Sequence, residues 1–245
     1  MQKQFTPANT IIFAAIVCFV CGIFVATAAV GLKPLQEENK VLDRQKNILS
    51  VAGILTDELA SNPEALKAAY ADRIKPTALA MNEGGCATDK KAGSFAAPAG
   101  NKAKVAQVPN CAEVFLVSDA QDKSKTETII LPVEGKGLWS TLKGYLAMNT
   151  NGVDIKGLTF YSHAETPGLG GEVDNPKWKK QWASKKAFKA GSAGVAIKVV
   201  KGQAKDEYGV DGLSGATLTS NGVTNLLQFW LDDARFGTYL KNFKN

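Results

Sequence analysis

The sequence predicts an α+β domain with an antiparallel sheet and flanking helices, preceded by one N-terminal transmembrane helix. An uncharged, apolar run of twenty residues, Ile11–Val30, lies near the start of the chain. Two β-rich runs separated by a polar turn, Ala112–Asp119 and Thr126–Val133, are typical of an antiparallel pair of strands. Strand-like and helix-like runs then follow without regular alternation, which disfavours a parallel sheet built from βαβ units.

The apolar run is long enough to cross a membrane. At about 1.5 Å per residue, a helix of this length covers about 30 Å, the thickness of the hydrocarbon core of a bilayer. A cleaved signal peptide is the alternative, because "ATAAV" resembles a cleavage site, but the apolar core of a signal peptide is usually shorter. We therefore expect an uncleaved anchor at residues 11–31 behind a short cytoplasmic leader, residues 1–10. The flanking charges leave the orientation open, since long domains translocate largely regardless of them.

The remainder of the chain divides into three predicted segments. Residues 32–81 are expected to be helical, because Pro34–Ile54 repeats apolar residues at helical spacing and Asn62–Ile74 begins with a capping Asn followed by Pro. Residues 82–110 are poor in large apolar residues and are predicted to be a flexible insertion. Residues 111–245 form the predicted main domain.

Patterns within the main domain predict its further elements. The expected strands are Gly152–His163 and Ala193–Gly202, and the expected helix between them is Asn175–Phe188. Gly137–Met148 is predicted to be helical or turn-like. A final amphipathic helix is expected to begin near Thr219–Asn221.

Composition excludes several classes of function. Hydrophobic residues make up 45% and charged residues 21% of the chain, as in ordinary globular proteins. The net charge of +6 comes without a basic run interleaved with aromatic residues, so we expect no nucleic-acid partner. The densest basic patch, Lys177–Trp182, is predicted to be a solvated helix face, with phospholipid or an acidic partner protein as the alternative contact. His163 is the only histidine, which nearly excludes a zinc site or a His-based triad; no metal is expected.

The four cysteines form two pairs with different surroundings. Cys18 and Cys21 lie inside the predicted membrane span and are expected to behave as small buried apolar residues. Cys86 and Cys111 flank the Gly/Ala-rich stretch, where an oxidising compartment would allow a disulfide. The sequence spacing alone leaves their pairing open.

The stretch "DGLSGATLTSNGV", at the start of the final helix, concentrates four hydroxyl side chains. Thr219 and Ser220 are explained as helix caps, whereas capping does not explain Ser214 and Thr217. Unpaired N–H groups at a helix N-terminus favour an anion such as phosphate, and Gly215 allows a positive φ. We predict that Thr217 either hydrogen-bonds a phosphate or is esterified to one. A capped turn without a ligand is the alternative.

A second stretch, "SHAETPGLGGEV", is suited to lie against a flat ring. Pro167 restricts the backbone, and the glycines that follow it keep the surface free of side chains while Leu169 projects an apolar group. An ordinary Pro–Gly turn is the alternative. Glu165 and Glu172 give only weak support for a pair of hydrolytic acids, so we expect them to be exposed loop carboxylates. His163 is expected to be a strand-end residue.

Together the two stretches resemble a known family. Asp211 followed by Ser-Gly-Ala-Thr at 214–217, with Ser-His-x-Glu-Thr-Pro-Gly-Leu-Gly at 162–170, is similar to the FMN-binding domain of membrane flavoproteins. The resemblance covers the anchor and most of Ala112–Leu240. It implies that FMN is joined through its phosphate to Thr217 by a separate flavin transferase, which uses FAD as donor and recognises Asp211.

From this resemblance and the two stretches we form a hypothesis for the remaining contacts with the flavin. The phosphate would be positioned by Ser214 and by the backbone at Gly215 and Ala216. The isoalloxazine ring would be lined by Thr166, Gly168, Leu169 and Gly170. Trp139 is a candidate packing partner of the ring, with a place in the core as the alternative. No catalytic residue is expected, because an electron carrier leaves the redox chemistry to its cofactor.

Two branches of this family share both motifs: the C-type subunits of sodium-translocating NADH:quinone reductases and the G-type subunits of Rnf electron transport complexes. The length of residues 35–110 favours the first. It implies a single-pass protein of the bacterial inner membrane with a periplasmic domain, where a disulfide between Cys86 and Cys111 is plausible. Its partners would be the other proteins of the complex, which export sodium while electrons pass from NADH towards ubiquinone. The alternatives are the Rnf-type subunit and an anchored binding or scaffold domain without a redox role.

Overall fold

The fold is that of a computed structural model, which describes residues 6–82, 85–86, 93–191 and 194–244. The chain separates into two compact units, Met1–Asp43 and Arg44–Asn245, and each is described by itself.

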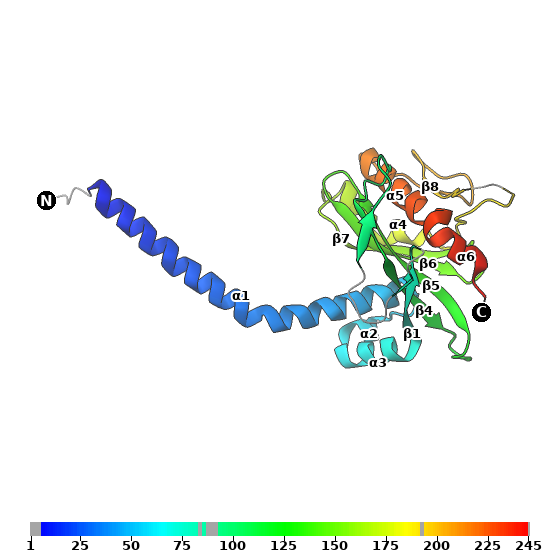
Figure 1. The fold of residues 1–245 in the computed structure, drawn as a ribbon, viewed down its shortest axis with the longest axis horizontal. Helices are drawn as coiled ribbons and strands as arrows, with labels where there is room; N and C mark the ends of the chain where they lie inside the picture. Colours follow the sequence, from blue (N-terminus) through cyan, green and yellow to red (C-terminus); the bar gives the residue numbers. More distant parts are fainter. Residues whose placement is uncertain (1–5, 83–84, 87–92, 192–193, 245) are drawn as a thin grey trace. The chain divides into compact units, whose positions relative to one another are not determined.

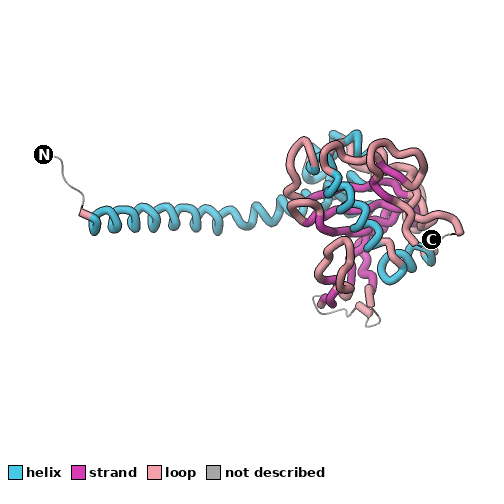
Figure 2. The backbone as a smooth tube through the Cα atoms, turned by 90° about the horizontal axis from the view of Figure 1, so that it is seen from above, coloured by secondary structure: helices cyan, strands magenta, loops and turns pink. Residues whose placement is uncertain are grey.

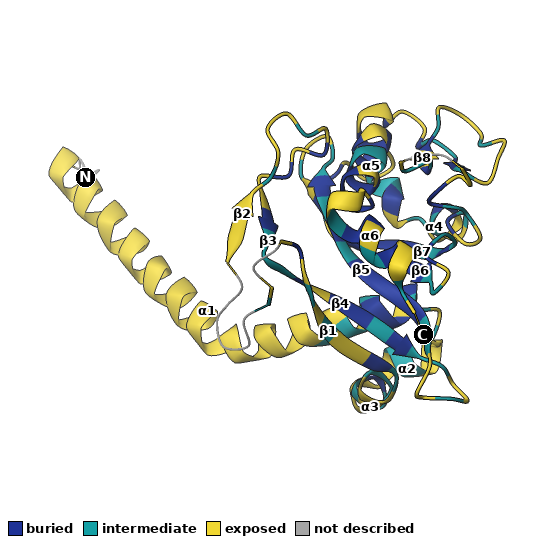
Figure 3. Ribbon diagram, turned by 45° about the vertical axis from the view of Figure 1, so that its right-hand side comes forward, coloured by how far each residue is buried: buried dark blue, intermediate teal, exposed yellow. Residues whose placement is uncertain are grey.

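The first unit is most of one long helix, α1 (Pro7–Val51). The most apolar 18 consecutive residues of α1 have a mean hydropathy of 2.8, and none of them is buried. No other helix in the described part of the chain is long and apolar enough to cross a membrane. Figure 3 shows this stretch exposed along its length. Cys18 and Cys21 lie on this stretch, where no other part of the protein covers them. Their burial inside a membrane span stays a prediction.

The second unit begins with two short helices, α2 (Asp57–Ser61) and α3 (Pro63–Arg73). The predicted cap of α3 is present, since Asn62 Oδ1 accepts hydrogen bonds from the N–H groups of Glu64 and Ala65 at 3.1 and 3.2 Å. The expected helical segment 32–81 is wrong at its end, where Ile74–Ala80 forms strand β1. Pairing with strand β4 (Cys111–Ser118) decides this, and Pro76 is tolerated because β1 is an edge strand.

A five-stranded antiparallel sheet forms the centre of the unit, in the order β1-β4-β5-β6-β7. Figure 2 shows the strands of this unit in magenta, with helices and loops around them. The expected pairing of its two central runs is confirmed by the register Phe115↔Ile130. The helical or turn-like prediction for Gly137–Met148 is wrong beyond the turn, because β5 and β6 form a hairpin around residues 137–140. The remaining strands of this sheet are β4 (Cys111–Ser118), β5 (Thr126–Lys136), β6 (Thr141–Asn149) and β7 (Ile155–Ser162).

Helix α5 (Thr217–Trp230) packs on the sheet and closes the core (Figure 1). Two glycines allow the close approach. A Cβ on Gly135 in β5 would lie 2.6 Å from Leu226 Cβ, and one on Gly222 would lie 2.5 Å from the carbonyl oxygen of Lys136. The N-terminus of α5 is thereby held beside the β5–β6 turn.

The prediction of a flexible insertion over residues 82–110 is wrong for much of the described part of this segment. Positions 83–84 and 87–92 lie outside the described residues. The rest includes a paired β2 (Ser94–Ala96) and β3 (Gln107–Pro109), and it contributes buried side chains to the core, so that part is not an exposed insertion. A disulfide joins Cys86 to Cys111 at the start of β4, with a Cα–Cα distance of 5.6 Å.

The region after β7 is less regular than predicted. The helix expected over Asn175–Phe188 is limited to α4 (Pro176–Lys180), because the chain then runs along the start of β7, where the N–H of Ser184 donates to the carbonyl of Ile155 at 2.9 Å. The strand expected at Ala193–Gly202 is reduced to Lys198–Val199. The other short elements are η1 (Gly170–Asp174), β8 (Lys198–Val199), β9 (Gly209–Val210), η2 (Asp233–Gly237) and α6 (Thr238–Asn242).

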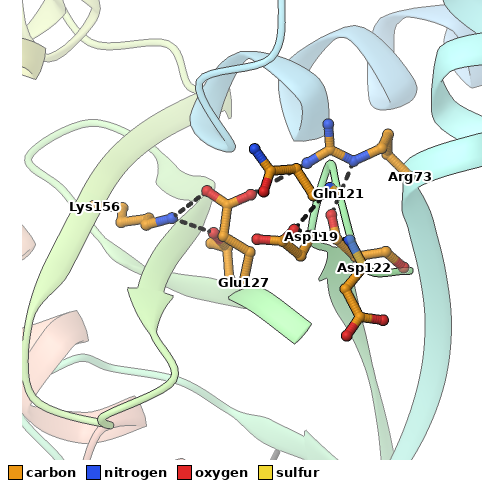
Figure 4. Close-up of polar contacts among 8 residues, drawn as sticks. Arg73, Asp119, Gln121, Asp122, Glu127 and Lys156 are labelled. Carbon is orange, nitrogen blue, oxygen red and sulfur yellow. Dashed lines mark hydrogen bonds and ion pairs between the residues drawn. The ribbon is translucent and has the colours of Figure 1, made fainter. Parts of the chain in front are cut away.

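A polar network holds the turn between β4 and β5 (Figure 4). The Glu127 carboxylate lies 3.2 Å from Arg73 and 2.8 Å from Lys156, which joins α3, β5 and β7. Arg73 also donates to the carbonyl of Ser118 at 2.8 Å, and Asp119 accepts two backbone N–H groups within the turn. This network lies at the opposite end of β5 from the β5–β6 turn, so it stabilises the sheet away from the two sequence motifs.

Candidate functional site

Three segments that are distant in sequence meet at the N-terminus of α5: the β5–β6 turn, the loop after β7, and the turn before α5. Glycines mark each meeting point. A Cβ on Gly215 would lie 2.9 Å from Leu169 Cδ2, so the two predicted motifs are in contact. A Cβ on Gly170 would lie 2.6 Å from Thr219 Oγ1, and one on Gly137 would lie 2.6 Å from Glu165 Oε1.

The turn before α5 presents a hydroxyl at an uncapped helix end. α5 begins at Thr217, and its N-cap residue Ala216 makes no side-chain capping bond. The first N–H groups of a helix have no acceptor within the helix, so they remain available to a ligand. Thr217, Ser214 and Gly215 are exposed, and Gly215 has a φ of 69° that L side chains rarely adopt.

Thr219 and Ser220 are not the caps that the sequence predicted. The helix starts two residues before Thr219, which places both side chains in the buried interior. Ser220 Oγ accepts the N–H of Leu213 at 3.1 Å, and Thr219 Oγ1 donates to Glu165 Oε2 at 2.7 Å. Both hydroxyls therefore bond to neighbouring parts of the site, and Ser220 also borders the pocket beside Thr217.

Asp211 is half-buried and fixes the start of the same turn. Its Oδ1 accepts the N–H of Ala204 at 2.7 Å, and its backbone carbonyl accepts from Trp178 Nε1 at 2.8 Å. Its own N–H donates to Gln181 Oε1 at 3.1 Å. Asp211 thus ties the turn to the segment after β8 and to the region of α4.

A pocket of about 420 Å³ opens beside the hydroxyl of Thr217. It lies between the turn before α5 and the segment that follows β8, and one basic side chain borders it. Its polar lining residues are Lys201, Gln203, Asp211, Ser214, Thr217, Ser220 and Asn221.

Each of the three segments that meet here carries an exposed apolar side chain. Trp139 in the β5–β6 turn is 68% exposed, which excludes its alternative place in the core. Leu169 is 44% exposed and Leu218, next to Thr217, is 60% exposed. Large exposed apolar groups gathered at one place indicate a binding surface.

The loop after β7 is held in a tight turn. The carbonyl of Thr166 accepts the N–H groups of Leu169 and Gly171 at 3.1 and 2.9 Å, and Gly168 has a φ of 74°. Gly170 is buried against the other segments, whereas the side chains of Thr166 and Leu169 are exposed. Leu169 of this loop therefore lies against the turn before α5.

Glu165 is a functional-site residue that the sequence analysis missed. It was expected to be an exposed loop carboxylate, but it is only 5% exposed. Its Oε1 accepts the N–H groups of Trp139 and Ser140 at 3.0 and 3.1 Å, and its Oε2 accepts that of Leu138 at 3.1 Å. Burial raises the pKa of Glu165, but the hydrogen bonds from Thr219 and the three N–H groups outweigh it and hold that pKa below its usual value.

The glycines on either side of this carboxylate are the signal that could have located it. A Cβ on Gly137 or on Gly170 would lie 2.6 or 2.8 Å from one of its oxygens, so a larger residue at either place would displace the carboxylate. Their contact with Glu165 is a tertiary contact, however, and the spacing of these residues in the sequence does not predict it. His163, the expected strand-end residue, lies 2.7 Å from Asp174 Oδ2 and accepts the N–H of Glu165 on its Nδ1.

Comparison with known proteins agrees with this geometry. The FMN-binding domain family matches residues 137–232, which begin at the β5–β6 turn and end just after α5. The C subunit of the Na(+)-translocating NADH-quinone reductase of Yersinia pestis is 40% identical, over 96% of this chain and 92% of that protein. The corresponding protein of Vibrio anguillarum is 42% identical, over 97% and 95%.

The chain belongs to the family of C subunits of Na(+)-translocating NADH-quinone reductases. Membership in this family confirms the resemblance inferred from the two motifs. It also confirms the C-type branch, which the length of residues 35–110 had favoured. The fold agrees, since the crystal structure of Shewanella oneidensis NqrC is similar with a TM-score of 0.74 and 29% identity, covering 85% of this chain and 98% of that one. The C subunit from Parabacteroides distasonis has a TM-score of 0.64 at 22% identity, over 87% of this chain and 98% of that one, which supports the fold alone.

Proposed function

We propose that this chain is the membrane-anchored, FMN-carrying electron-transfer subunit of a Na(+)-translocating NADH:ubiquinone reductase. The observation that carries the proposal is the exposed hydroxyl of Thr217, at the uncapped N-terminus of α5 and beside the glycine-rich loop at Leu169. Family membership and the match to the FMN-binding domain support the choice of cofactor.

The residues at the site fit FMN at both of its ends. The open N–H groups at the start of α5 and the positive φ of Gly215 suit a phosphate. Ser214 and the backbone at Ala216 complete this part of the site. The exposed apolar side chains of Leu169 and Trp139 suit the flat isoalloxazine ring.

The loop after β7 would line the ring with backbone as well as side chain. Thr166, Gly168 and Gly170 supply a surface that carries few side chains beside Leu169. When bound, FMN supplies reversible electron transfer, and the chain holds it at a fixed place and sets the polarity around it. No residue of the chain needs to act as a catalyst in this role.

The attachment we propose is a phosphoester to Thr217, formed by a separate flavin transferase with FAD as donor. The threonine oxygen attacks the FMN phosphorus of FAD, the pyrophosphate bond breaks, and AMP leaves. The proton of the hydroxyl passes to a base of the transferase. Asp211 is the recognition residue in this proposal, and its hydrogen bond to Ala204 supports a role in presenting the turn.

The anchor and the disulfide support a location in the bacterial inner membrane with the main domain in the periplasm. α1 would cross the membrane at residues 11–31, behind a cytoplasmic leader of residues 1–10, and the FMN-binding domain would occupy residues 111–245. The disulfide between Cys86 and Cys111 is favoured in an oxidising compartment. Other proteins of the complex would carry sodium while this one passes electrons towards ubiquinone.

Flavin fluorescence in a denaturing gel tests the attachment. The full chain is produced with its flavin transferase, and the parent is compared with Thr217→Ala and with Ser214→Ala, which removes the neighbouring exposed hydroxyl. We expect a fluorescent band for the parent and for Ser214→Ala, and none for Thr217→Ala, with the adduct mass on the peptide that contains Thr217. A fluorescent Thr217→Ala band would refute the assignment.

A further inference from the structure

We propose that Glu165 is the positioning residue that assembles the flavin site, and that its negative charge lowers the reduction potential of the flavin held there. This inference rests on the proposed function for its second part only. The first part concerns the arrangement of the chain itself.

Glu165 is an unusual residue in this molecule because it is a buried charge. Among the described residues it is the only charged side chain in the buried class, at 5% exposure. Within the same part of the chain no Lys or Arg pairs with it, and its stabilising partners are hydrogen-bond donors. A buried carboxylate without a cationic partner is costly unless several donors solvate it.

The donors come from separate segments of the site. The β5–β6 turn supplies the N–H groups of Leu138, Trp139 and Ser140, and the Ser140 hydroxyl lies 3.2 Å from Oε1. α5 supplies the hydroxyl of Thr219 at 2.7 Å. One carboxylate thus joins the turn that carries Trp139, its own loop and the helix that begins at Thr217.

Two glycines pack closely against the carboxylate. A Cβ on Gly137 would lie 2.6 Å from Oε1 and one on Gly170 would lie 2.8 Å from Oε2, so both glycine backbones rest directly against it. A further bond closes the ring of contacts, since the N–H of Ala164 donates to Ser140 Oγ at 2.8 Å. The position of Trp139 relative to Leu169 is therefore set through Glu165.

The charge has a second consequence for an electron carrier. A flavin gains negative charge when it is reduced, and a fixed anion in a poorly solvated place opposes that gain. Because the anion lies among the segments that form the site, it acts on any flavin held there and favours the oxidised form.

Two substitutions separate the charge from the hydrogen bonds. Glu165→Gln removes the charge and replaces one acceptor oxygen by an NH₂ group. Thr219→Val keeps the charge but removes one donor at nearly the same size. Glu172→Gln is the matched control, because it removes a charge from the same loop. The Glu172 carboxylate accepts a hydrogen bond from Asn175 Nδ2, outside the site.

The first measurement is hydrogen exchange at the amides of Leu138, Trp139 and Ser140, in the full chain carrying Thr217→Ala so that no flavin is present. We expect Glu165→Gln to exchange at least tenfold faster there, with Thr219→Val intermediate and Glu172→Gln unchanged. Equal protection in parent and Glu165→Gln would overturn the positioning role. If Glu165→Gln does not fold, Thr219→Val is measured in its place. Exchange rates in Thr219→Val equal to those of the parent would then overturn the positioning role.

The second measurement is the midpoint potential of flavinylated protein. We expect a more positive potential in Glu165→Gln, and the parent value in Glu172→Gln and Thr219→Val. A potential equal to that of the parent in Glu165→Gln would overturn the electrostatic role. A parent protein that takes up no flavin would refute the proposed function, while the exchange result would still decide the positioning role.

Discussion

Gly215 lies directly against Leu169, although the two residues come from separate motifs on either side of α4 and β8. A Cβ on Gly215 would lie 2.9 Å from Leu169 Cδ2, and the φ of Gly215 is 69°. The contact brings the hydroxyl-rich turn and the glycine-rich loop together as one surface. Both features of Gly215 lead to a prediction.

Replacement of Gly215 by Ala should strain the turn and reduce flavin attachment. A left-handed conformation costs an Ala about 1–2 kcal/mol, which corresponds to a loss in Tm of a few degrees for a domain of this size. Thermal unfolding and in-gel flavin fluorescence measure the two effects. The double variant with Leu169→Ala removes the steric contact but keeps the backbone strain, so it should recover only part of the loss. Full recovery would show that the conformation of Gly215 is unimportant.

Replacement of Gly222 by Ala should destabilise the domain even though Ala favours helices. The new Cβ would lie 2.5 Å from the carbonyl oxygen of Lys136, which is backbone and cannot move aside. Overpacking of this kind costs about 1–3 kcal/mol, against about 1 kcal/mol gained in helix propensity. Chemical denaturation followed by circular dichroism measures the sign of the change in unfolding free energy. Gln228→Ala on the exposed face of α5 is the control, and a Gly222→Ala protein as stable as this control would contradict the close packing.

The stabilising effect of Glu165 should depend on pH in the acidic range. Burial raises its pKa, but the hydrogen bonds from Thr219 and the backbone outweigh it, so the folded-state pKa lies below the ordinary value of 4.5. A lowered pKa means that the carboxylate contributes stability above 4.5, and that this contribution disappears as the pH falls through the folded-state pKa. The difference in unfolding free energy between the parent and Glu165→Gln should therefore shrink below pH 4.5. A difference that is constant from pH 7 to pH 3 would contradict this account.

Loss of the disulfide should destabilise the main domain without touching the site. The bond between Cys86 and Cys111 closes a loop with a sequence separation of 25 residues, for which the chain-entropy model gives about 3.5 kcal/mol. We expect a Cys86→Ser, Cys111→Ser protein to melt at a lower temperature and to retain covalent flavin. Cys18→Ser, Cys21→Ser removes the two exposed thiols of α1 and serves as the control. An unchanged melting temperature in the first variant would show that the disulfide is not stabilising.

Local patterns in the sequence determined the long apolar N-terminal helix, the β4–β5 pair, the cap of α3 and the two motifs that carry Thr217 and Leu169. Each of these features is expressed by residues close together in the chain, through apolar periodicity, turn residues or a capping side chain.

Only the tertiary structure decided the rest of the site. β6 is a strand because β5 and β7 pair with it on both sides, and Ile74–Ala80 leaves the helical pattern because β4 offers it an edge. Glu165 is buried because two segments far apart in the sequence, the β5–β6 turn and α5, turn their N–H and O–H donors towards its carboxylate. A buried charge depends on donors brought from elsewhere in the chain, and such donors become visible only when the chain has folded.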